Sequence, residues 1–271
     1  YVSVLMMENK VVTKKVLERA GISVPGGYEY TSPEAGMADY RMYAGKPVVI
    51  KPKSTNFGLG ITILKHNYDE TDFKAALQIA FEHDNTVLIE KFIPGREFRI
   101  FIINDEVVGI LHRVPANVTG DGVLNIGQLI DRKNEDPLRG KGYRTPLEKI
   151  RKGREEEMFL KQQGMDFNTV PKEGEVVYLR ENSNISTGGD SIDFTDDIDD
   201  SYKAIAVEAA KALNVKITGL DMMIQDIHAP ATPDNYAIIE MNFNPAIHIH
   251  CYPFKGKNRH LNHKMIRALG F

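Results

Sequence analysis

Residues 48–60, VVIKPKSTNFGLG, decide how the rest of this sequence is interpreted. The apolar beginning predicts a short buried strand, and residues 61–64 predict a second strand after the loop. Lys51 and Lys53 are two residues apart, so an extended chain points both ammonium groups to one face. The stretch therefore presents two cations at the start of a glycine-containing loop that links two strands.

The loop itself has the composition of a phosphate cradle. Ser54 offers a hydroxyl, and Gly58 and Gly60 let backbone N–H groups approach an anion closely. The order of residues differs from a Walker A loop, and no Gly-x-Gly-x-x-Gly precedes a helix. A triphosphate site and an ordinary glycine hairpin with surface lysines both remain open on spacing alone.

Three oxygen-bearing side chains near the end of the sequence form a candidate metal site. Glu240 and Asn242 are two residues apart near a strand end, and Asp221 falls in a neighbouring predicted strand. Mg²⁺ typically takes one or two carboxylates and completes its shell with water and phosphate oxygens. The alternative is that these are polar residues that close two strand ends.

Residues 90–97, EKFIPGRE, are a third candidate segment. A strand that ends at a lobe boundary leaves backbone groups available to bind the edge of a base, and Glu97 could accept hydrogen bonds from ribose hydroxyls. Taken alone, the segment is better explained as a strand, a turn and a salt-bridged surface.

A fourth segment, residues 180–189, begins with Arg180 and ends in Ser-Thr-Gly-Gly. Arg180 could bind a carboxylate in a bidentate manner. Ser186, Gly188 and Gly189 offer hydroxyl and backbone donors for developing negative charge, and Arg113 could assist. The alternative is a capped loop before the next helix.

A zinc site and a nucleophilic cysteine are both disfavoured. His248, His250 and Cys251 lack the paired spacing of a zinc site, and no base partner for Cys251 is identifiable. Since Cys251 is the single cysteine, an intrachain disulfide is excluded, which fits a reducing compartment, and we expect the cytoplasm.

Composition limits the class of protein. The 271 residues include 34 Lys and Arg against 37 Asp and Glu, a net charge of −3, so a globally basic nucleic-acid coat is excluded. No apolar run approaches the roughly 18 residues of a membrane span. The sequence begins without a methionine or a signal peptide, and we expect a fragment of a longer chain.

Strands and helices intermix without strict alternation, which predicts an α+β fold. A smaller, β-rich lobe is expected over residues 21–95, after an N-terminal strand and helix over 1–20, and a larger lobe over 96–271. Helices are expected over residues 8–20, 69–83, 154–163, 200–213 and 258–269. Strands are expected over residues 47–52, 61–64, 86–93, 97–103, 107–114, 176–180, 217–224 and 236–241.

The order of these motifs resembles the ATP-grasp family of carboxylate–amine ligases. The resemblance rests on VVIKPK, the glycine loop, EKFIPGRE, GLD at 219–221 and IIEMN at 238–242, which span nearly the whole chain. Residues 178–189 and 240–253 are similar to the glutathione synthetase modules of bifunctional glutamate–cysteine ligase/glutathione synthetases. Cyanophycin synthetases share the Arg…Ser-Thr-Gly-Gly pattern and the region around residues 112–116.

The resemblance implies two α+β lobes with ATP between them and a role for each motif. Lys10, Lys51 and Lys53 would face the phosphates, with the loop through Gly58 and Gly60 as a flap that includes Ser54. Glu90, Lys91, Phe92 and Ile93 would line the adenine, and Glu97 the ribose. Asp221, Glu240 and Asn242 would hold two Mg²⁺ or Mn²⁺ ions. Arg113 would face the γ-phosphate, and Arg180 with Ser186, Gly188 and Gly189 would hold peptide or glycine.

The resemblance further implies the ATP-dependent joining of γ-glutamylcysteine to glycine, giving glutathione, ADP and phosphate through an acyl phosphate. The glutamate–cysteine ligase part is absent from these residues, so it would lie upstream in a longer chain. Two alternatives remain: a different ATP-grasp ligase such as a cyanophycin-type or D-amino-acid ligase, and a module that binds ATP without turnover. A kinase is disfavoured because neither His-Arg-Asp nor Asp-Phe-Gly occurs.

Overall fold

The computed structural model describes residues 2–54, 59–65 and 67–270. The chain divides into two units, each assembled from separate segments. Unit 1 contains Tyr1–Arg96, Asn104–Glu106 and Ile198–Pro245, and unit 2 contains Glu97–Ile103, Val107–Asp197 and Ala246–Phe271. No helix among the described residues combines the length and the apolar character that crossing a bilayer requires.

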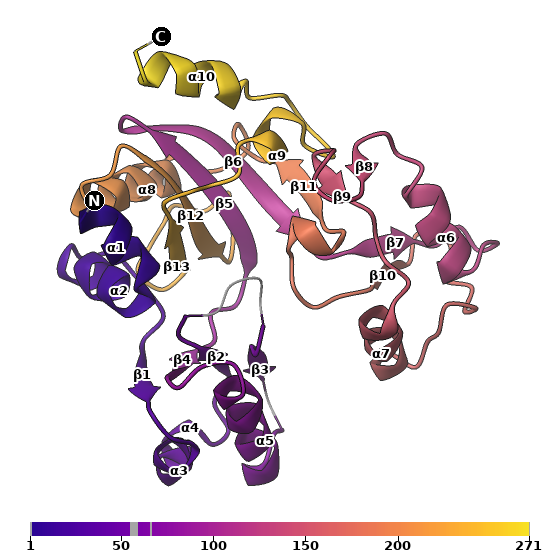
Figure 1. Ribbon diagram of the computed structural model, residues 1–271, viewed down its shortest axis with the longest axis horizontal. Helices are drawn as coiled ribbons and strands as arrows, with labels where there is room; N and C mark the ends of the chain where they lie inside the picture. The colour runs from indigo at the N-terminus through magenta and orange to yellow at the C-terminus, as the bar shows by residue number, and fades with distance from the viewer. Residues whose placement is uncertain (1, 55–58, 66, 271) are drawn as a thin grey trace. The chain divides into compact units, whose positions relative to one another are not determined.

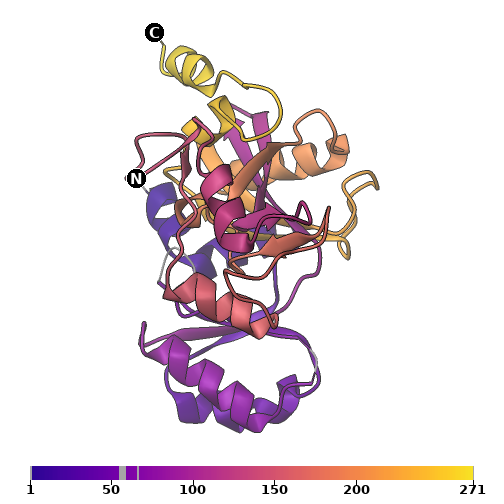
Figure 2. The same ribbon diagram turned by 90° about the vertical axis from the view of Figure 1, so that its right-hand side faces the viewer.

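One layer of unit 1 is a four-stranded antiparallel sheet in the order β1-β4-β2-β3. Helices α3, α4 and α5 lie on one face of it (Figures 1 and 2). The apolar core between them includes Ile50, Phe73, Leu77 and Ile89. The bounds are β1 Gly27–Tyr30, β2 Val48–Pro52, β3 Thr62–Leu64, β4 Val87–Lys91, α3 Pro33–Ala38, α4 Tyr40–Tyr43 and α5 Glu70–Phe81.

Helix α5 begins where the sequence predicts it. Asp69 accepts hydrogen bonds from the N–H groups of Thr71 (2.8 Å) and Asp72 (2.9 Å), and the Asp72 carboxylate accepts from the Asp69 N–H (3.1 Å). This reciprocal capping box satisfies N–H groups that have no partner inside the helix.

The other layer of unit 1 is the antiparallel pair β12 (Ile217–Ile224) and β13 (Tyr236–Asn242), with helices α1 (Val2–Glu8), α2 (Lys10–Arg19) and α8 (Asp200–Ala212). The strand that we expected at the N-terminus is wrong, because residues 2–8 form helix α1. Its Val and Leu residues suit a strand, but Met7 is buried and α1 packs against β13. Tertiary packing overrides such local preference.

Unit 2 contains strands β11, β6 and β5 with β11 antiparallel to β6. Strands β5 (Arg96–Ile103) and β6 (Glu106–Val114) are joined through Asn104 and Asp105, whose φ angles are 47° and 65°. These positive values are those of a tight hairpin turn. The two strands predicted at residues 97–103 and 107–114 are confirmed, and they form a hairpin. Strand β11 covers Asp190–Asp193.

Unit 2 has an apolar core between the strand pair β7–β10 and helices α6 and α7 (Figure 1). The sequence predicts α7 (Arg154–Gln162) and β10 (Val176–Tyr178), but not β7 (Asn117–Thr119) or α6 (Ile126–Lys133). The remaining elements are the parallel pair β8 (Arg139–Gly140) and β9 (Leu147–Glu148), the 3₁₀ turn η1 (Ile185–Thr187), and helices α9 (His248–Cys251) and α10 (Leu261–Ala268).

Candidate functional site

The face of the four-stranded sheet that carries no helices is charged. Val48 and Ile50 point to the apolar core, so the alternate residue Lys51 points to the opposite face. Val49 is directly opposite Glu90 on β4, which puts Glu90 on the same face as Lys51. The Lys51 Nζ lies 2.8 Å from Glu90 Oε2, and Lys53 Nζ lies 2.9 Å from Glu29 Oε2.

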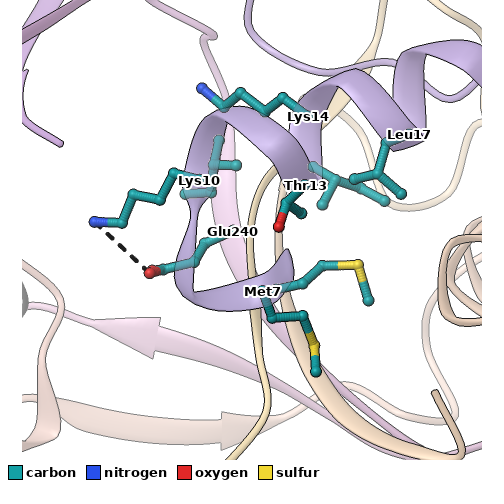
Figure 3. Close-up of a pocket in the computed structure, with 9 residues that line it drawn as sticks. Met7, Lys10, Thr13, Lys14, Leu17 and Glu240 are labelled. Carbon is teal, nitrogen blue, oxygen red and sulfur yellow. Dashed lines mark ion pairs between the residues drawn. The ribbon is translucent and has the colours of Figure 1, made fainter. Parts of the chain in front are cut away.

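Helix α2 adds two further cations to this region of unit 1. Asn9 caps the helix by accepting from two N–H groups, and Lys10 and Lys14 follow one turn apart. Lys14 forms an ion pair with Glu90, and Lys10 Nζ lies 3.8 Å from Glu240 Oε1. Figure 3 shows the Lys10 ammonium directed at the Glu240 carboxylate.

The cavity beneath these lysines is small. It measures about 10 Å³ and is lined by α1, α2 and β13, with Thr13 and Leu17 among its walls (Figure 3). That volume is at the limit of what a single water molecule needs. A ligand as large as a nucleotide would therefore contact the outer side of the lysines rather than fill this cavity.

Two ammonium groups face the single buried carboxylate of Glu90. Burial alone would raise the pKa of Glu90, but Lys51 and Lys14 hold it below its ordinary value. Burial and the neighbouring Lys51 lower the pKa of Lys14 to about 8. Burial also lowers the pKa of Lys10, against the opposing effect of Glu240. This excess of positive charge over Glu90 suits an anion such as a phosphate group.

The candidate metal ligands share one face of the β12–β13 pair. Asp221 is directly opposite Glu240, and Asn242 is two residues beyond Glu240 on the same strand. Asp221 is 2% exposed, and the Asn242 Nδ2 is buried with no hydrogen-bond partner among the described residues. The Asn242 Nδ2 is a donor, which an anionic oxygen such as that of a phosphate can satisfy. The Asn242 Oδ1 and the two carboxylates are oxygen ligands that suit a hard divalent cation. The residues present therefore fit such an ion.

The described residues hold no group of three or more His, Cys, Asp or Glu side chains arranged for a metal ion. The candidate set contains only two such residues, Asp221 and Glu240, because its third member, Asn242, is an amide. The set is therefore compatible with that finding. His248, His250 and Cys251, which the sequence disfavours as a zinc site, form no such group either.

The remaining nucleotide candidates of unit 1 lie along the end of β4 and the edge of the loop. The N–H groups of Lys91 and Phe92 donate to Gly26 O (2.8 Å) and Pro47 O (3.0 Å). The Ser54 N–H donates to Asp84 Oδ2 at 2.7 Å. Gly60 has a φ of 73° and adjoins Pro52 and His83. Ile93 follows Phe92 directly, and Gly58 lies outside the described residues.

In unit 2, Glu97 and Arg113 form an ion pair. They come from the neighbouring strands β5 and β6, and the Ser183 hydroxyl donates to Glu97 Oε2 at 3.0 Å. The His112 ring nitrogen Nδ1 lies 2.9 Å from Glu97 O. The structure thus brings together two residues that the sequence assigned to different parts of a nucleotide.

Arg180 is held by two acidic residues at the start of α7. Its Nε donates to Glu156 Oε1 at 2.7 Å, and Nη2 lies 2.6 Å from the same oxygen. Its Nη1 forms an ion pair with Glu155, whose side chain is 71% exposed. Glu156 is buried and fixes one edge of the guanidinium, so a substrate carboxylate would compete with the exposed Glu155 for the other edge.

The turn at residues 185–189 uses its own N–H groups internally. Thr187 and Gly189 donate to Asn184 O (both 3.2 Å), and Gly188 donates to Ile185 O (3.1 Å). Gly188 and Gly189 therefore shape the turn, and the Ser186 hydroxyl becomes the candidate donor to a substrate.

Comparison with known proteins identifies the fold. A family described as "RimK-like ATP-grasp domain" matches residues 7–132. The glutathione biosynthesis bifunctional protein GshAB of Desulfotalea psychrophila is 62% identical over the whole chain, which covers 35% of that relative. A crystal structure of a bifunctional glutathione synthetase from Pasteurella multocida is 48% identical with a TM-score of 0.76, and the match covers 99% of this chain and 37% of that one.

This chain has the ATP-grasp fold. A D-alanine–D-alanine ligase from Bacillus anthracis shares the fold alone, with 20% identity, a TM-score of 0.54, and coverage of 90% of this chain and 59% of that one. The chain spans about a third of the length of the curated relatives it matches.

Sequence reasoning missed one cation of the candidate site. Lys14 was not singled out, because a lysine in a predicted surface helix is ordinarily assigned to the exposed face. In the structure Thr13, Lys14 and Leu17 are buried, whereas Val12 is 37% exposed. The spacing of Lys10, Thr13, Lys14 and Leu17 at i, i+3, i+4 and i+7 was the available signal.

Proposed function

We propose that this chain catalyses the ATP-dependent joining of γ-glutamylcysteine to glycine, giving glutathione, ADP and phosphate. The observation that carries the proposal is the charged face of unit 1, where Lys51 and Lys14 converge on Glu90 and Lys10 pairs with Glu240. The similar proteins are named for glutathione biosynthesis, and these names supply the substrate class.

In the first step, an oxygen of the peptide's terminal carboxylate attacks the γ-phosphorus of ATP, and the bond to ADP breaks. Lys10, Lys51 and Lys53 would bind the phosphates, and Glu90 would keep the Lys51 ammonium in place. Arg113 would bind the transferring phosphoryl group. These residues act by positioning and by neutralising charge.

In the second step, the amine of glycine attacks the acyl phosphate, phosphate leaves, and the amine gives up a proton. Arg180 would orient a substrate carboxylate, and the Ser186 hydroxyl would donate to the developing oxyanion. The loop containing Ser54 and Gly60 would exclude water, which otherwise hydrolyses the acyl phosphate.

Asp221, Glu240 and Asn242 would hold divalent cations, and we propose two Mg²⁺ or Mn²⁺ ions. Such ions, when bound, neutralise the negative charge of the phosphates. Glu90 to Ile93 would line the adenine, and Glu97 the ribose.

We further propose that the whole protein is longer and contains a glutamate–cysteine ligase module that supplies the γ-glutamylcysteine. The similar curated proteins are about three times as long as the match and are named bifunctional. We place the reaction in the cytoplasm, because its substrate and product carry free thiols and Cys251 is unpaired.

The test is ADP release by the full-length protein with Mg²⁺, ATP and γ-glutamylcysteine, with and without glycine. Omission of glutamate and cysteine silences an upstream ligase. Glycine-dependent ADP matched by an equal amount of glutathione would support the proposal. ADP release that responds to a different amine would replace it with another ligase activity, and ATP binding without any turnover would contradict catalysis.

Asp221→Asn and Glu240→Gln should each lower the rate about a hundredfold or more, because each removes a charged ligand of the proposed cations. Glu208→Gln is the matched control, since Glu208 is an exposed carboxylate of α8 that pairs with Lys211 at 3.0 Å in the same unit. Rates near wild type in both strand variants would contradict the metal assignment.

A further inference from the structure

A buried guanidinium holds the back of the turn that contains Ser186. The Arg139 side chain is fully buried, and its Nη1 donates to Gly188 O at 3.0 Å and to Glu148 O at 2.9 Å. Its Nη2 forms an ion pair with Asp190, which directly follows Gly189 at the start of β11. One planar group therefore bonds to the chain on both sides of Gly189.

The turn has little freedom to adjust if this group is lost. A Cβ at Gly188 would lie 2.8 Å from the Cα of Ile150, and Gly188 has a φ of 93°. A Cβ at Gly189 would lie 2.8 Å from Val114 O. The backbone is thus in close contact with β6 and with Ile150, two residues after β9, and Arg139 adds hydrogen bonds beside that contact.

The Asp190 carboxylate is itself fixed from the other side. Its Oδ2 accepts from Lys133 Nζ at 2.7 Å and from Asn117 Nδ2 at 3.0 Å. The Phe254 ring lies under both cations, 5.2 Å from Lys133 Nζ and 5.4 Å from the Arg139 guanidinium carbon. Asp190 is 4% exposed and Arg139 is 3% exposed, so this ion pair is removed from solvent.

Buried ion pairs contribute little net stability compared with well-packed apolar residues. What Arg139 provides that an apolar residue or a lysine would not is geometry: a rigid fork that binds two carbonyl oxygens and a carboxylate at once. This geometry is transmitted to the turn through the Gly188 carbonyl and through Asp190.

We propose that Arg139 is a positioning residue that fixes the turn at residues 185–189 in the orientation needed to hold the acceptor substrates. The inference rests on the proposed function in that it assigns Ser186 and its neighbours to the peptide or glycine. The held turn presents the Ser186 hydroxyl, and a shift of about 1 Å in such a group can cost on the order of a hundredfold in rate.

The experiment compares Arg139→Lys with Arg259→Lys in the full-length protein. Arg259 is the matched control because its Nε pairs with Asp193 on the same strand (2.9 and 3.0 Å), yet it bonds to no residue of the turn. Arg139→Lys should raise the KM for glycine or γ-glutamylcysteine about tenfold or more while the KM for ATP stays within about twofold. Arg259→Lys should change neither.

Equal KM values in Arg139→Lys and wild type would overturn the inference, as would an equal rise in the KM for ATP. If Arg139→Lys does not fold, Asp190→Asn decides the question, since it keeps the side-chain size and removes the charge that holds Arg139. It should give the same selective rise in the acceptor KM, and an unselective loss would overturn the inference.

Hydrogen exchange separates this inference from the proposed function. The N–H groups of Thr187, Gly188 and Gly189 should exchange at least about tenfold faster in Arg139→Lys than in Arg259→Lys, because they bond inside the turn. If the wild-type protein makes no glutathione but this exchange difference is present, the proposed function fails while the positioning role of Arg139 is supported. If the exchange is unchanged, the positioning role of Arg139 is overturned, whatever the activity.

Discussion

At the scale of single residues, His250 is the most unusual side chain outside the candidate site. It lies on α9, is fully buried, and its two ring nitrogens have no hydrogen-bond partner among the described residues. Its ring packs edge-on against Phe101 at 5.5 Å, and a Cβ at Gly109 would lie 2.7 Å from Nδ1. The backbone of β6 at Gly109 packs closely against Nδ1, and the apolar surroundings suit a neutral imidazole.

The His250 environment opposes protonation. Burial, with Arg99 in support, lowers the pKa of His250 to about 3, while Asp193 acts in the opposite direction and His248 and Arg113 add smaller effects. Between about pH 3 and pH 6.5 the unfolded chain binds a proton that the folded chain does not. The free energy of unfolding therefore falls as the pH is lowered through this window.

His250→Leu should reduce the loss of stability between pH 6.5 and pH 4, because it removes the proton that the unfolded state gains. The measurement is the urea midpoint of unfolding at several pH values, compared with wild type. His228→Gln serves as the control, since His228 is exposed. A pH slope in His250→Leu as steep as that of wild type would show that His250 does not govern the acid limb.

At the scale of elements, long elements with local signals were predicted well. The predicted helices at residues 69–83 and 200–213 are confirmed as α5 and α8, and the last two predicted strands as β12 and β13. Each of these elements shows its hydrophobic periodicity within its own residues. The sequence missed β8 and β9, two residues each, because they exist only through their pairing with one another.

Helix α6 was missed although its signal was present. The Asn125 side chain accepts from the Gln128 N–H at 2.8 Å, and the Gln128 side chain accepts from the Asn125 N–H at 3.0 Å. This is a capping box, and its residue types at i and i+3 are visible in the sequence.

The candidate site also contains features that the sequence predicts and features that it does not. Strand alternation predicts that Lys51 and Lys53 share a face, but the pairing of Lys14 with Glu90 joins residues 76 apart and has no local signal.

The cap of α5 gives an element-scale prediction. Asp69→Ala should lower the free energy of unfolding by about 1 kcal/mol, because two N–H groups lose their acceptor. Urea denaturation measures this difference. Lys74→Ala, an exposed change in the middle of the same helix, should cost less than about 0.5 kcal/mol. Equal effects of the two changes would show that the cap does not stabilise the helix.

At the scale of the whole molecule, unit 1 is formed by segments that lie far apart in the sequence. The sequence suggested a linear boundary at Pro94-Gly95, whereas residues 198–245 join the unit formed by the first 96 residues. This return supplies Asp221, Glu240 and Asn242 to the unit that carries Lys10, Lys51 and Glu90. A single boundary in the sequence cannot describe a unit that contains two distant segments. The limits of the two lobes stay a prediction.

The binding of nucleotide should therefore stabilise the folded protein as a whole. We expect saturating MgATP to raise the thermal midpoint of the full-length protein, since a ligand at a hundred times its Kd adds about 2.7 kcal/mol. Lys51→Ala should remove most of the increase, while Lys46→Ala, an exposed lysine just before β2, should retain it. A wild-type midpoint that does not respond to MgATP would contradict the nucleotide site.

The position of Cys251 matters for a protein proposed to work on thiols. Its side chain is 4% exposed, and its Sγ lies 3.7 Å from Asn262 Oδ1. Under oxidation, a pool of γ-glutamylcysteine and glutathione forms disulfides that exchange with accessible thiolates. Because the single cysteine of these 271 residues is buried, S-glutathionylation by glutathione, the proposed product, has no exposed target here. Oxidative stress would then reach this part of the protein through the supply of reduced substrate rather than through adduct formation.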